Sequence, residues 1–246
     1  MAPSPRPCDG GLVPRNVVVL ARPPRKVHVE VVALTVEEAR ALVAAVAGSR
    51  FEMLFILALK TGMRRGELLA LHWEDVDLDK GVLQVRGTLR RTREGLRIGT
   101  PKTAASRRRV VLSPSSVAAL RRHRARQQEE RQAAGGFWQD LGLVFPNTLG
   151  RPMEPRCLLS DVYRPLLKRA GLPPVTFHTL RHTAATLLLA EGEHPKVVQE
   201  LLGHAQVSIT LDRYSHMTPT LMSNATLLMD RLLDEEESPL HEYGEP

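Results

Sequence analysis

The sequence predicts an α+β fold, mainly helical, with one small three-stranded antiparallel sheet. Apolar residues recur at helical spacing before residue 72 and after residue 112, whereas residues 82–112 show the shorter alternation that is typical of strands. Aromatic residues make up only 4% of the 246 residues and hydrophobic residues 43%, a composition typical of a soluble, mostly helical protein. This length allows one large core or two modest ones.

Residues 1–32 are predicted to be a linker-like segment without a core of its own. They contain six prolines, two adjacent glycines and scattered arginines, which interrupt regular structure. One β-like run lies within them, at 16–20. We therefore expect a folded domain over residues 33–233, followed by an acidic, disordered tail over residues 234–246.

Three helices are expected in the first part of the domain. Thr35 and Glu38 form a capping-box pattern at the start of the first, and Gly48 marks its end. The second covers residues 51–60, which are almost all apolar and rich in Leu, Ala and Met, so we expect it in the core. A third, short helix is expected over residues 65–71.

The three strands of the sheet are expected between residues 82 and 112. Val82–Val85 provides the first strand, and a turn at Gly87 leads into a second segment that ends at Ile98. Arg107–Leu112 provides the third strand. The run 143–145 also has the composition of a short strand.

The remainder of the domain is expected to be mostly helical. Ser113-Pro114 starts a helix that runs to about Ala133 and is dense in arginine, so its outer face should be solvated or lie on DNA. Gly135-Gly136 ends this helix. After a loop, the predicted helices cover residues 155–170, 178–191, 195–202, 207–214 and 218–233.

The charge distribution predicts a polyanionic partner. The formal net charge is +7, and six of the 27 acidic residues lie in the segment 234–246, so the rest of the chain is more basic still. Lysine and arginine side chains that neutralise phosphates release counterions and so gain affinity for nucleic acid. An excess of charge also serves solubility, so composition alone does not decide between the two interpretations.

The sequence favours a cytoplasmic, nucleoid-associated protein. The longest apolar run, at 53–59, is too short to cross a bilayer, and we expect no membrane partner. Cys8 and Cys157 are far apart, belong to no CxxC pair and follow no signal peptide, so neither a disulfide framework nor a zinc site is expected.

The stretch 176–214 concentrates side chains that suit an anionic substrate. His178 and Arg181 are three residues apart and share a face near the start of a predicted helix, where free amide groups also favour an anion. An isolated pair of this kind is most often structural. His178 and His182 have zinc-binding spacing, but Arg181 would lie beside the cation and no HExxH pattern occurs, so we expect no metal.

Two further side chains in this stretch could take part in chemistry. His204 follows Leu202-Gly203 at the end of a predicted helix, and Tyr214 lies ten residues later. A phenol, imidazoles and a guanidinium together supply a nucleophile, proton carriers and charge stabilisation. A single tyrosine is more often a core residue, and Tyr163 and Tyr243 have no such neighbours in the sequence.

Four motifs occur along the chain in a fixed order. They are Thr61–Leu71 (TGMRRGELLAL), Pro101–Thr103 with Ser106–Arg108 (PKT and SRR), His178–His182 with Leu202–His204 (HTLRH and LGH), and Thr210–His216 (TLDRYSH). Together they resemble the arginine box, the hairpin lysine and the second catalytic box of the tyrosine recombinases of the phage integrase family. Each motif is weak alone, but all four in this order are specific. The resemblance covers residues 33–233, the catalytic domain of that family.

This resemblance implies a site-specific DNA recombinase, or integrase, that needs neither metal nor ATP. Tyr214 would attack a DNA phosphodiester, form a 3′-phosphotyrosyl intermediate and free a 5′-hydroxyl, and a second strand's hydroxyl would reverse the step. Arg64 and Arg181 would hold the non-bridging oxygens and stabilise their charge in the transition state.

The resemblance also implies roles in proton transfer and phosphate binding. Lys102 would be the general acid toward the leaving oxygen. His178 would assist deprotonation of Tyr214, and His204 would hydrogen-bond the phosphate.

Other residues would support these groups or bind DNA. Glu67, one turn after Arg64, would orient that arginine, and His182 would lie behind the residues that touch the phosphate. Five arginines in and around the predicted hairpin would contact DNA: Arg93, Arg97, Arg107, Arg108 and Arg109.

Family members usually carry a helical core-binding domain ahead of the catalytic domain. Residues 14–34 resemble the segment that joins the two, so we expect a catalytic half whose partner domain is missing. Two alternatives remain open: a non-catalytic DNA-binding remnant that regulates full-length recombinases, and a type IB topoisomerase, although the HTLRH and LGH motifs are closer to the integrases. The expected partners are double-stranded DNA and further copies of the chain.

Self-association is predicted through the last helix. An apolar stripe along it would dock on a neighbouring copy in a tetramer on DNA. Alternatively, this helix packs on its own domain and plays no part in self-association. The stripe consists of Leu221, Leu227, Leu228 and Leu232.

Overall fold

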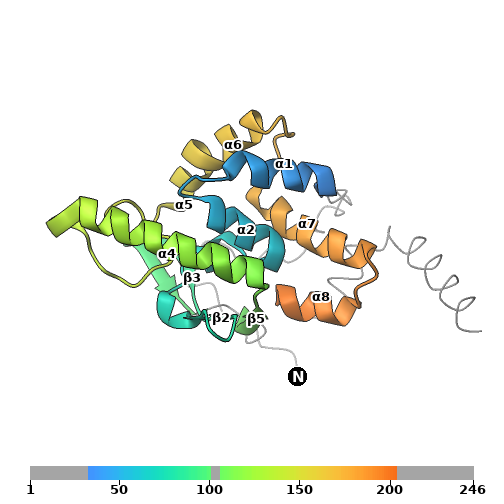
Figure 1. Ribbon diagram of the computed structural model, residues 1–246, viewed down its shortest axis with the longest axis horizontal. Coiled ribbons are helices and arrows are strands. Elements are labelled where there is room, and N and C mark those ends of the chain that lie inside the picture. Colours follow the sequence, from blue (N-terminus) through green and yellow to red (C-terminus); the bar gives the residue numbers. More distant parts are fainter. Residues whose placement is uncertain (1–32, 101–105, 204–246) are drawn as a thin grey trace, which may run out of the picture. The chain divides into compact units, whose positions relative to one another are not determined.

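The structure is a computed structural model that describes residues 33–100 and 106–203 (Figure 1). The chain divides into two units, Met1–Glu30 and Val31–Pro246, and every described residue belongs to the second. The helices expected at 207–214 and 218–233, the tail and the N-terminal segment lie outside the described residues. No helix in the described part is long and apolar enough to cross a membrane.

The described part is mainly helical with a small amount of antiparallel sheet, which confirms the predicted fold class. The helices are α1 (Val36–Val46), α2 (Glu52–Thr61), α3 (Arg65–Leu68), α4 (Pro114–Ala134), α5 (Pro155–Cys157), α6 (Arg164–Arg169), α7 (Phe177–Ala190) and α8 (Pro195–Leu202). Short 3₁₀ turns are η2 (Trp73–Asp75) and η4 (Gly135–Phe137), and η5 (Leu158–Tyr163) is a π-helical segment. The strands are β1 (Val76–Asp77), β2 (Val82–Val85), β3 (Thr88–Thr92), β4 (Gly95–Gly99) and β5 (Arg108–Val111).

Helix α1 begins at the predicted capping box. The Thr35 hydroxyl accepts a hydrogen bond from the Glu38 amide at 3.2 Å, and the Glu38 carboxylate accepts one from the Thr35 amide at 2.9 Å. One residue earlier, the Leu34 amide donates to the Thr183 hydroxyl of α7 at 2.9 Å. The start of the domain is therefore fixed both to its own first helix and to the helix that carries the HTLRH motif.

Replacing Thr35 by alanine is expected to lower the free energy of unfolding by about 1 kcal/mol, because the Glu38 amide loses the acceptor that stands in for an intrahelical carbonyl. Chemical denaturation of the two proteins measures the difference. Thr35→Ser keeps the hydroxyl and should stay close to the wild type. If serine destabilised the domain as much as alanine does, the cap would not be the cause.

Helix α2 is buried at the centre of the core, as its apolar sequence predicts. Leu54 and Phe55 are fully buried, and the helix packs against α1, α4 and α7. The Phe55 ring lies 5.8 Å from the Tyr163 ring and 5.9 Å from the Phe177 ring, measured between centroids. This aromatic cluster joins α2 to η5 and to the first turn of α7. Tyr163 also donates to the Thr176 carbonyl at 3.1 Å, and burial raises the pKa of its phenol, so it is a core residue.

The strands differ from the prediction in how they pair. A three-stranded antiparallel sheet is present, but its order is β1-β2-β5, and β3 and β4 form a separate two-stranded hairpin. The sequence predicts one strand ending at Ile98 where the structure has two, joined by a turn that includes Gly95 at φ 114°. This hairpin is largely exposed and rich in arginine, so it lacks the apolar alternation that would have revealed its turn. In the sheet, Leu83 of β2 pairs with Val110 of β5, and both are buried.

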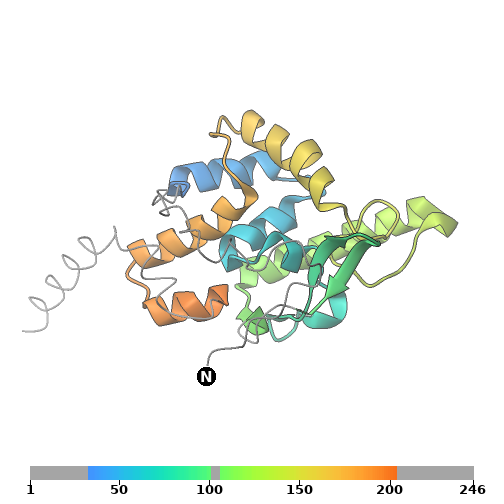
Figure 2. The same cartoon turned by 180° about the vertical axis from the view of Figure 1, so that it is seen from behind.

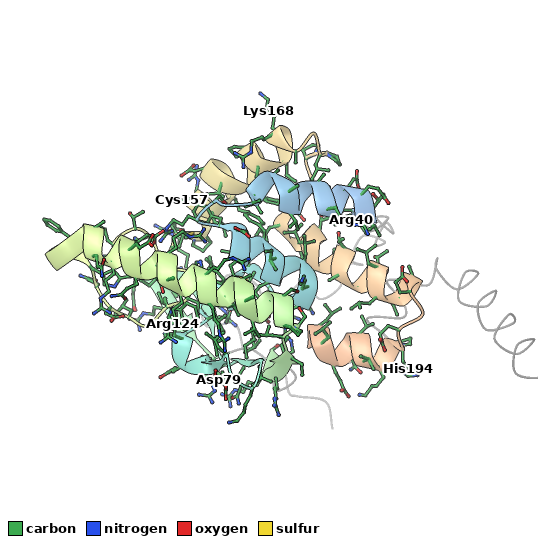
Figure 3. All side chains as sticks on the ribbon, viewed as in Figure 1. Arg40, Asp79, Arg124, Cys157, Lys168 and His194 are labelled. Atoms are coloured by element: carbon green, nitrogen blue, oxygen red, sulfur yellow. The ribbon has the colours of Figure 1, made fainter. Side chains whose placement is uncertain are left out.

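The hairpin and α4 lie on opposite faces of the described part, as the two opposite views show (Figures 1 and 2). Ser113 caps α4 by accepting a hydrogen bond from the Ser116 amide at 3.3 Å, and the outer face of this helix is exposed, as predicted. Charged side chains such as Arg124 on α4 and Lys168 on α6 lie on the outside (Figure 3). The run 143–145 forms only an isolated bridge between His72 and Leu143, not a strand.

Candidate active site

The turn between α2 and α3 brings the first arginine motif against the last two described helices. Gly62 ends α2 in the left-handed conformation at φ 59°, and a Cβ at this position would lie 2.2 Å from Leu202 Cδ2 in α8. The Gly62 carbonyl accepts a hydrogen bond from Arg181 Nη1 in α7 at 2.7 Å. Glycine meets both the backbone conformation and the close approach. The turn at Thr61-Gly62 therefore places Arg64 close to α7 and α8.

Arg64 and Glu67 form a close ion pair at the start of α3. Glu67 Oε1 accepts from Arg64 Nη1 at 2.7 Å, and Glu67 Oε2 accepts from the Arg64 amide at 3.0 Å. The Arg64 side chain is 38% exposed and that of Glu67 only 2%. Burial opposes the charge of Glu67, but Arg108 and Arg64 outweigh it and hold the pKa of this carboxyl below its usual range. The carboxylate is therefore ionised and orients a guanidinium that still reaches the surface.

Arg108 contacts Glu67 from the other side. Its Nη2 donates to Glu67 Oε2 at 3.1 Å, and its Nε donates to the Leu201 carbonyl of α8 at 2.6 Å. The Arg108 side chain is only 6% exposed, and burial lowers the pKa of its guanidinium. The sequence predicts Arg108 as a DNA contact, but the structure turns this guanidinium inward to a carboxylate and a helix end.

The HTLRH motif lies on the first two turns of α7. His178 is exposed near the start of the helix, and Arg181 is 2% exposed beneath it, where it binds the Gly62 carbonyl. The His178 and His182 rings lie 4.6 Å apart between centroids, at 87° to each other. Within residues 33–100 and 106–203, no group of three or more metal-ligating side chains is placed to hold an ion.

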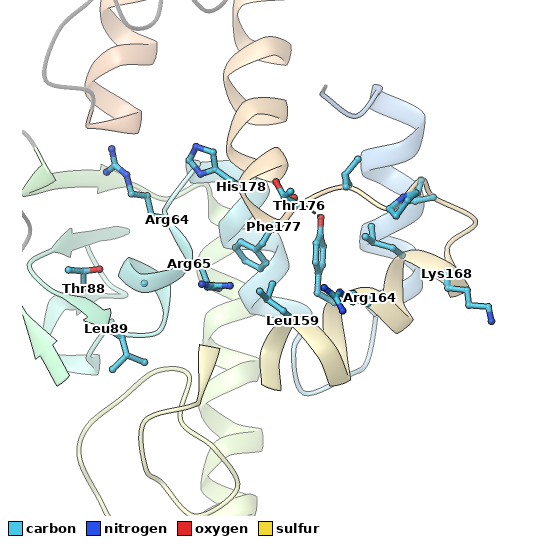
Figure 4. A pocket seen from close by; sticks show the side chains of 16 residues that line it. Arg64, Arg65, Thr88, Leu89, Leu159, Arg164, Lys168, Thr176, Phe177 and His178 are labelled. Atoms are coloured by element: carbon cyan, nitrogen blue, oxygen red, sulfur yellow. Dashed lines mark hydrogen bonds between the residues drawn. The ribbon is translucent and has the colours of Figure 1, made fainter. Parts of the chain in front are cut away.

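A cavity of about 1010 Å³ opens beside these residues (Figure 4). Arg64 and His178 lie next to each other at one end of it (Figure 4). Its wall is apolar around Leu159 and Phe177, and further cations line it. These are Arg65, Arg164 and Lys168. The cavity thus joins the two candidate catalytic motifs in one basic, partly apolar hollow.

Three of the predicted catalytic residues, Lys102, His204 and Tyr214, lie outside the described residues. The chain is described up to Gly203, which ends α8 in the left-handed conformation at φ 68°. Its carbonyl lies 3.5 Å from Arg64 Nη2, within hydrogen-bonding distance. The residue directly before His204 is therefore in contact with Arg64.

The other arginines predicted to bind DNA are exposed. Arg93 lies in the turn between β3 and β4, and Arg97 on β4 pairs with Glu94. Arg107 and Arg109 flank Arg108 and point outward. A β-strand turns alternate side chains to opposite faces, so the apolar Val110 indicates that Arg108 faces inward with it. That alternation is the sequence signal that could have separated Arg108 from its neighbours. Arg65 lines the cavity, and no comparable pattern in the sequence predicts this position.

The chain is similar in sequence to tyrosine recombinases and integrases. The model of the Phage integrase family matches residues 33–220. A tyrosine recombinase XerC-like protein of Caldanaerobacter subterraneus subsp. tengcongensis is 36% identical over an alignment of 238 residues, which covers 92% of this chain and 60% of that protein. An integrase of Saccharopolyspora erythraea is 28% identical over 90% of this chain and 62% of its own length. The chain thus spans about 60% of the length of these relatives.

Solved structures show the same fold. The Tn1549 transposon integrase in complex with circular intermediate DNA is 27% identical, with a TM-score of 0.67 over 82% of this chain and 67% of that one. The XerA recombinase is 26% identical, with a TM-score of 0.62 over 85% of this chain and 67% of that one. A lambda integrase tetramer bound to a Holliday junction shares the fold alone, at 22% identity, a TM-score of 0.53, and coverage of 83% of this chain and 54% of that one. With its arginine and HTLRH motifs joined at one cavity, this chain belongs to the phage integrase family.

Proposed function

We propose that this chain is a site-specific DNA recombinase that cleaves and rejoins DNA strands through a 3′-phosphotyrosyl intermediate at Tyr214. The observation that carries the proposal is the shared position of Arg64 and His178 at one end of a basic cavity, with Arg181 held beneath them. The Arg64 side chain is 38% exposed and His178 is exposed beside it, so both lie at the surface that a phosphate would approach.

The proposed reaction conserves the energy of the phosphodiester bond. The Tyr214 oxygen attacks the phosphorus as the bond to the 5′-oxygen breaks, and Lys102 donates a proton to that leaving oxygen. His178 takes up the tyrosine proton, and His204 hydrogen-bonds the phosphate. In the second step the 5′-hydroxyl of another strand attacks the phosphorus and gives its proton to Lys102. The bond to Tyr214 breaks, and His178 returns the proton to the tyrosine oxygen.

The guanidiniums of Arg64 and Arg181 stabilise the charge that builds on the non-bridging oxygens. Such donors act most strongly when they are fixed before the reaction begins. Support comes from their anchoring: Arg64 is bound to buried Glu67, and Arg181 donates to the Gly62 carbonyl of the same turn. His182, whose ring packs edge-on against that of His178, steadies His178 from behind.

The proposed partner is double-stranded DNA. The exposed arginines Arg93, Arg97, Arg107 and Arg109 would contact its phosphates, which position the duplex without reading its sequence. A DNA complex of the Tn1549 integrase and a tetramer of lambda integrase on a Holliday junction are structural relatives. We therefore include a tetramer on DNA, docked through the apolar stripe at Leu221–Leu232, in the proposal. Residues 33–233 would form the catalytic domain, between the linker-like segment 1–32 and the acidic tail 234–246, in a nucleoid-associated protein.

The test is formation of a covalent adduct with nicked suicide DNA substrates, including the DNA that flanks the gene. Wild-type protein is expected to form the adduct and Tyr214→Phe to form none, because phenylalanine lacks the attacking oxygen. Tyr243→Phe, in the acidic tail, is the matched control and should react like the wild type. If the wild type bound DNA but formed no adduct on any substrate, the catalytic proposal would fail and the chain would be a DNA-binding protein.

A further inference from the structure

We propose that Arg108 is a positioning residue, which holds Arg64 and the end of α8 in the arrangement required for strand cleavage. The inference rests on the proposed function, since it concerns the same reaction. It differs from the role that the sequence predicts for Arg108, a contact with DNA.

The guanidinium of Arg108 joins three segments that are far apart in the sequence. Nε donates to the Leu201 carbonyl at 2.6 Å, Nη2 to Glu67 Oε2 at 3.1 Å, and Nη1 lies 3.4 Å from the Ser106 carbonyl. The side chain is 6% exposed, so solvent screens these contacts little. One planar group therefore links α3, α8 and the residues just before β5.

Glu67 transmits the effect of Arg108 to Arg64. The same carboxylate binds Arg108 through Oε2 and Arg64 through both oxygens, at 2.7 Å to Nη1 and 3.0 Å to the amide. A buried carboxylate held from one side only would change both its position and its charge state. Removing the guanidinium of Arg108 is therefore expected to shift the group that aims Arg64.

The bond to Leu201 acts on the other side of the site. Carbonyls in the last turn of a helix have no intrahelical donor, and a cation there is favoured by the helix dipole. Arg108 satisfies one of these carbonyls in α8, and Gly203 follows with its own carbonyl 3.5 Å from Arg64. The end of α8 therefore lies between Arg108 and Arg64 and contacts both side chains.

A lysine at position 108 cannot reproduce this set of hydrogen bonds. Arginine presents donors in a fixed planar fork, whereas lysine offers a single charged point on a flexible stem. A lysine at position 108 can pair with Glu67 or bind the Leu201 carbonyl, but does not span both in the same geometry. Arg108→Lys thus keeps the charge in the core while breaking the link.

The first measurement separates cleavage from binding in single-turnover reactions with suicide substrates. Arg108→Lys is expected to form the Tyr214 adduct about 10- to 100-fold more slowly, the size of effect that small misplacements in active sites produce. Its DNA dissociation constant should stay within about threefold of the wild type, since the side chain is buried and not on DNA. Arg108→Lys with unchanged adduct formation, or with DNA binding reduced as much as cleavage, would overturn the inference.

Arg50→Lys is the matched control. Arg50 also pairs through Nε with a glutamate, Glu130, at 2.7 Å, and the two side chains are 21% and 23% exposed. This pair lies away from the cavity, so its loss should leave the cleavage rate unchanged. If Arg50→Lys slowed cleavage as much as Arg108→Lys, the effect would reflect general destabilisation.

A double-mutant cycle tests the link through Glu67. If Arg108 and Glu67 act as one unit, Glu67→Gln combined with Arg108→Met should cleave no more slowly than the slower single variant. Effects that multiply would show that the two residues act separately.

Hydrogen exchange gives a measurement that does not depend on cleavage. The amides of Leu202 and Gly203, at the end of α8, should exchange faster in Arg108→Lys than in the wild type, and Arg50→Lys should leave them unchanged. Unchanged exchange in Arg108→Lys would overturn the inference even in a protein that cleaves DNA. Conversely, a wild type without adduct but with this exchange pattern would contradict the proposed function and leave the positioning contact in place.

Discussion

Arg64→Lys is expected to slow formation of the Tyr214 adduct by about 100- to 1000-fold, the cost of losing one fixed donor to a developing oxyanion. Arg64 binds Glu67 through Nη1 and keeps the rest of its guanidinium near the cavity, with 38% of the side chain exposed. A lysine would retain the ion pair with Glu67 but have no planar fork left for the two phosphate oxygens.

Single-turnover cleavage of a suicide substrate measures this effect, and thermal unfolding shows whether the variant is folded. The melting temperature should change little, because the charge beside Glu67 is kept. Arg40→Lys, on the exposed face of α1 (Figure 3), is the control and should react like the wild type. A rate for Arg64→Lys within about threefold of the wild type would remove Arg64 from the proposed phosphate site.

Gly66→Ala is expected to destabilise the domain by about 2 kcal/mol, a typical cost of overpacking. A Cβ at Gly66 would lie 2.6 Å from Thr88 Oγ1 and 2.8 Å from the Leu89 carbonyl oxygen, so helix α3 and strand β3 would have to separate. The intrinsic preference of alanine for helix acts in the opposite direction and is smaller, roughly 1 kcal/mol. The same displacement would carry Arg64, two residues earlier, out of place.

Chemical denaturation measures the loss of stability, and Gly136→Ala provides the matched control. A Cβ at Gly136 meets nothing within 4 Å, and neither glycine has a positive φ, so this control adds the same methyl group without the close contact. Gly136→Ala should be neutral or slightly stabilising because it restricts the unfolded chain. Equal free energies of unfolding for the two variants would show that α3 and β3 can move apart without loss of stability.

Local signals in the sequence predicted much of the helical fold. The capping box at Thr35 and Glu38 and the glycine stop at Gly48 depend only on neighbouring residues, and the structure has both, with α1 ending at Val46 and Gly48 at φ 71°. The predicted helices at 178–191 and 195–202 match α7 and α8 to within one residue at each end. The predicted helix 155–170 contains the π-helical segment η5, whose wider hydrogen bonding the apolar spacing did not reveal.

Contacts between distant segments could not be predicted in the same way. The pairing of β2 with β5 skips the intervening hairpin, and no local pattern states which strands become neighbours. The three partners of Arg108 come from residues 67, 106 and 201, so its role depends on the tertiary fold. By contrast, the motifs of Arg64 and of His178 and Arg181 could be related to one site only through the family resemblance, and the structure brings these residues together.

The hydrogen bond between the Leu34 amide and the Thr183 hydroxyl has a consequence for engineered fusions. Thr183 lies two residues after Arg181, and its hydroxyl also donates to the Thr179 carbonyl within α7. Any module fused ahead of residue 33 would therefore be attached to the chain at a fixed point on the helix that carries His178 and Arg181. Linker length, counted back from Leu34, then sets how far an added DNA-reading module reaches from the proposed catalytic site.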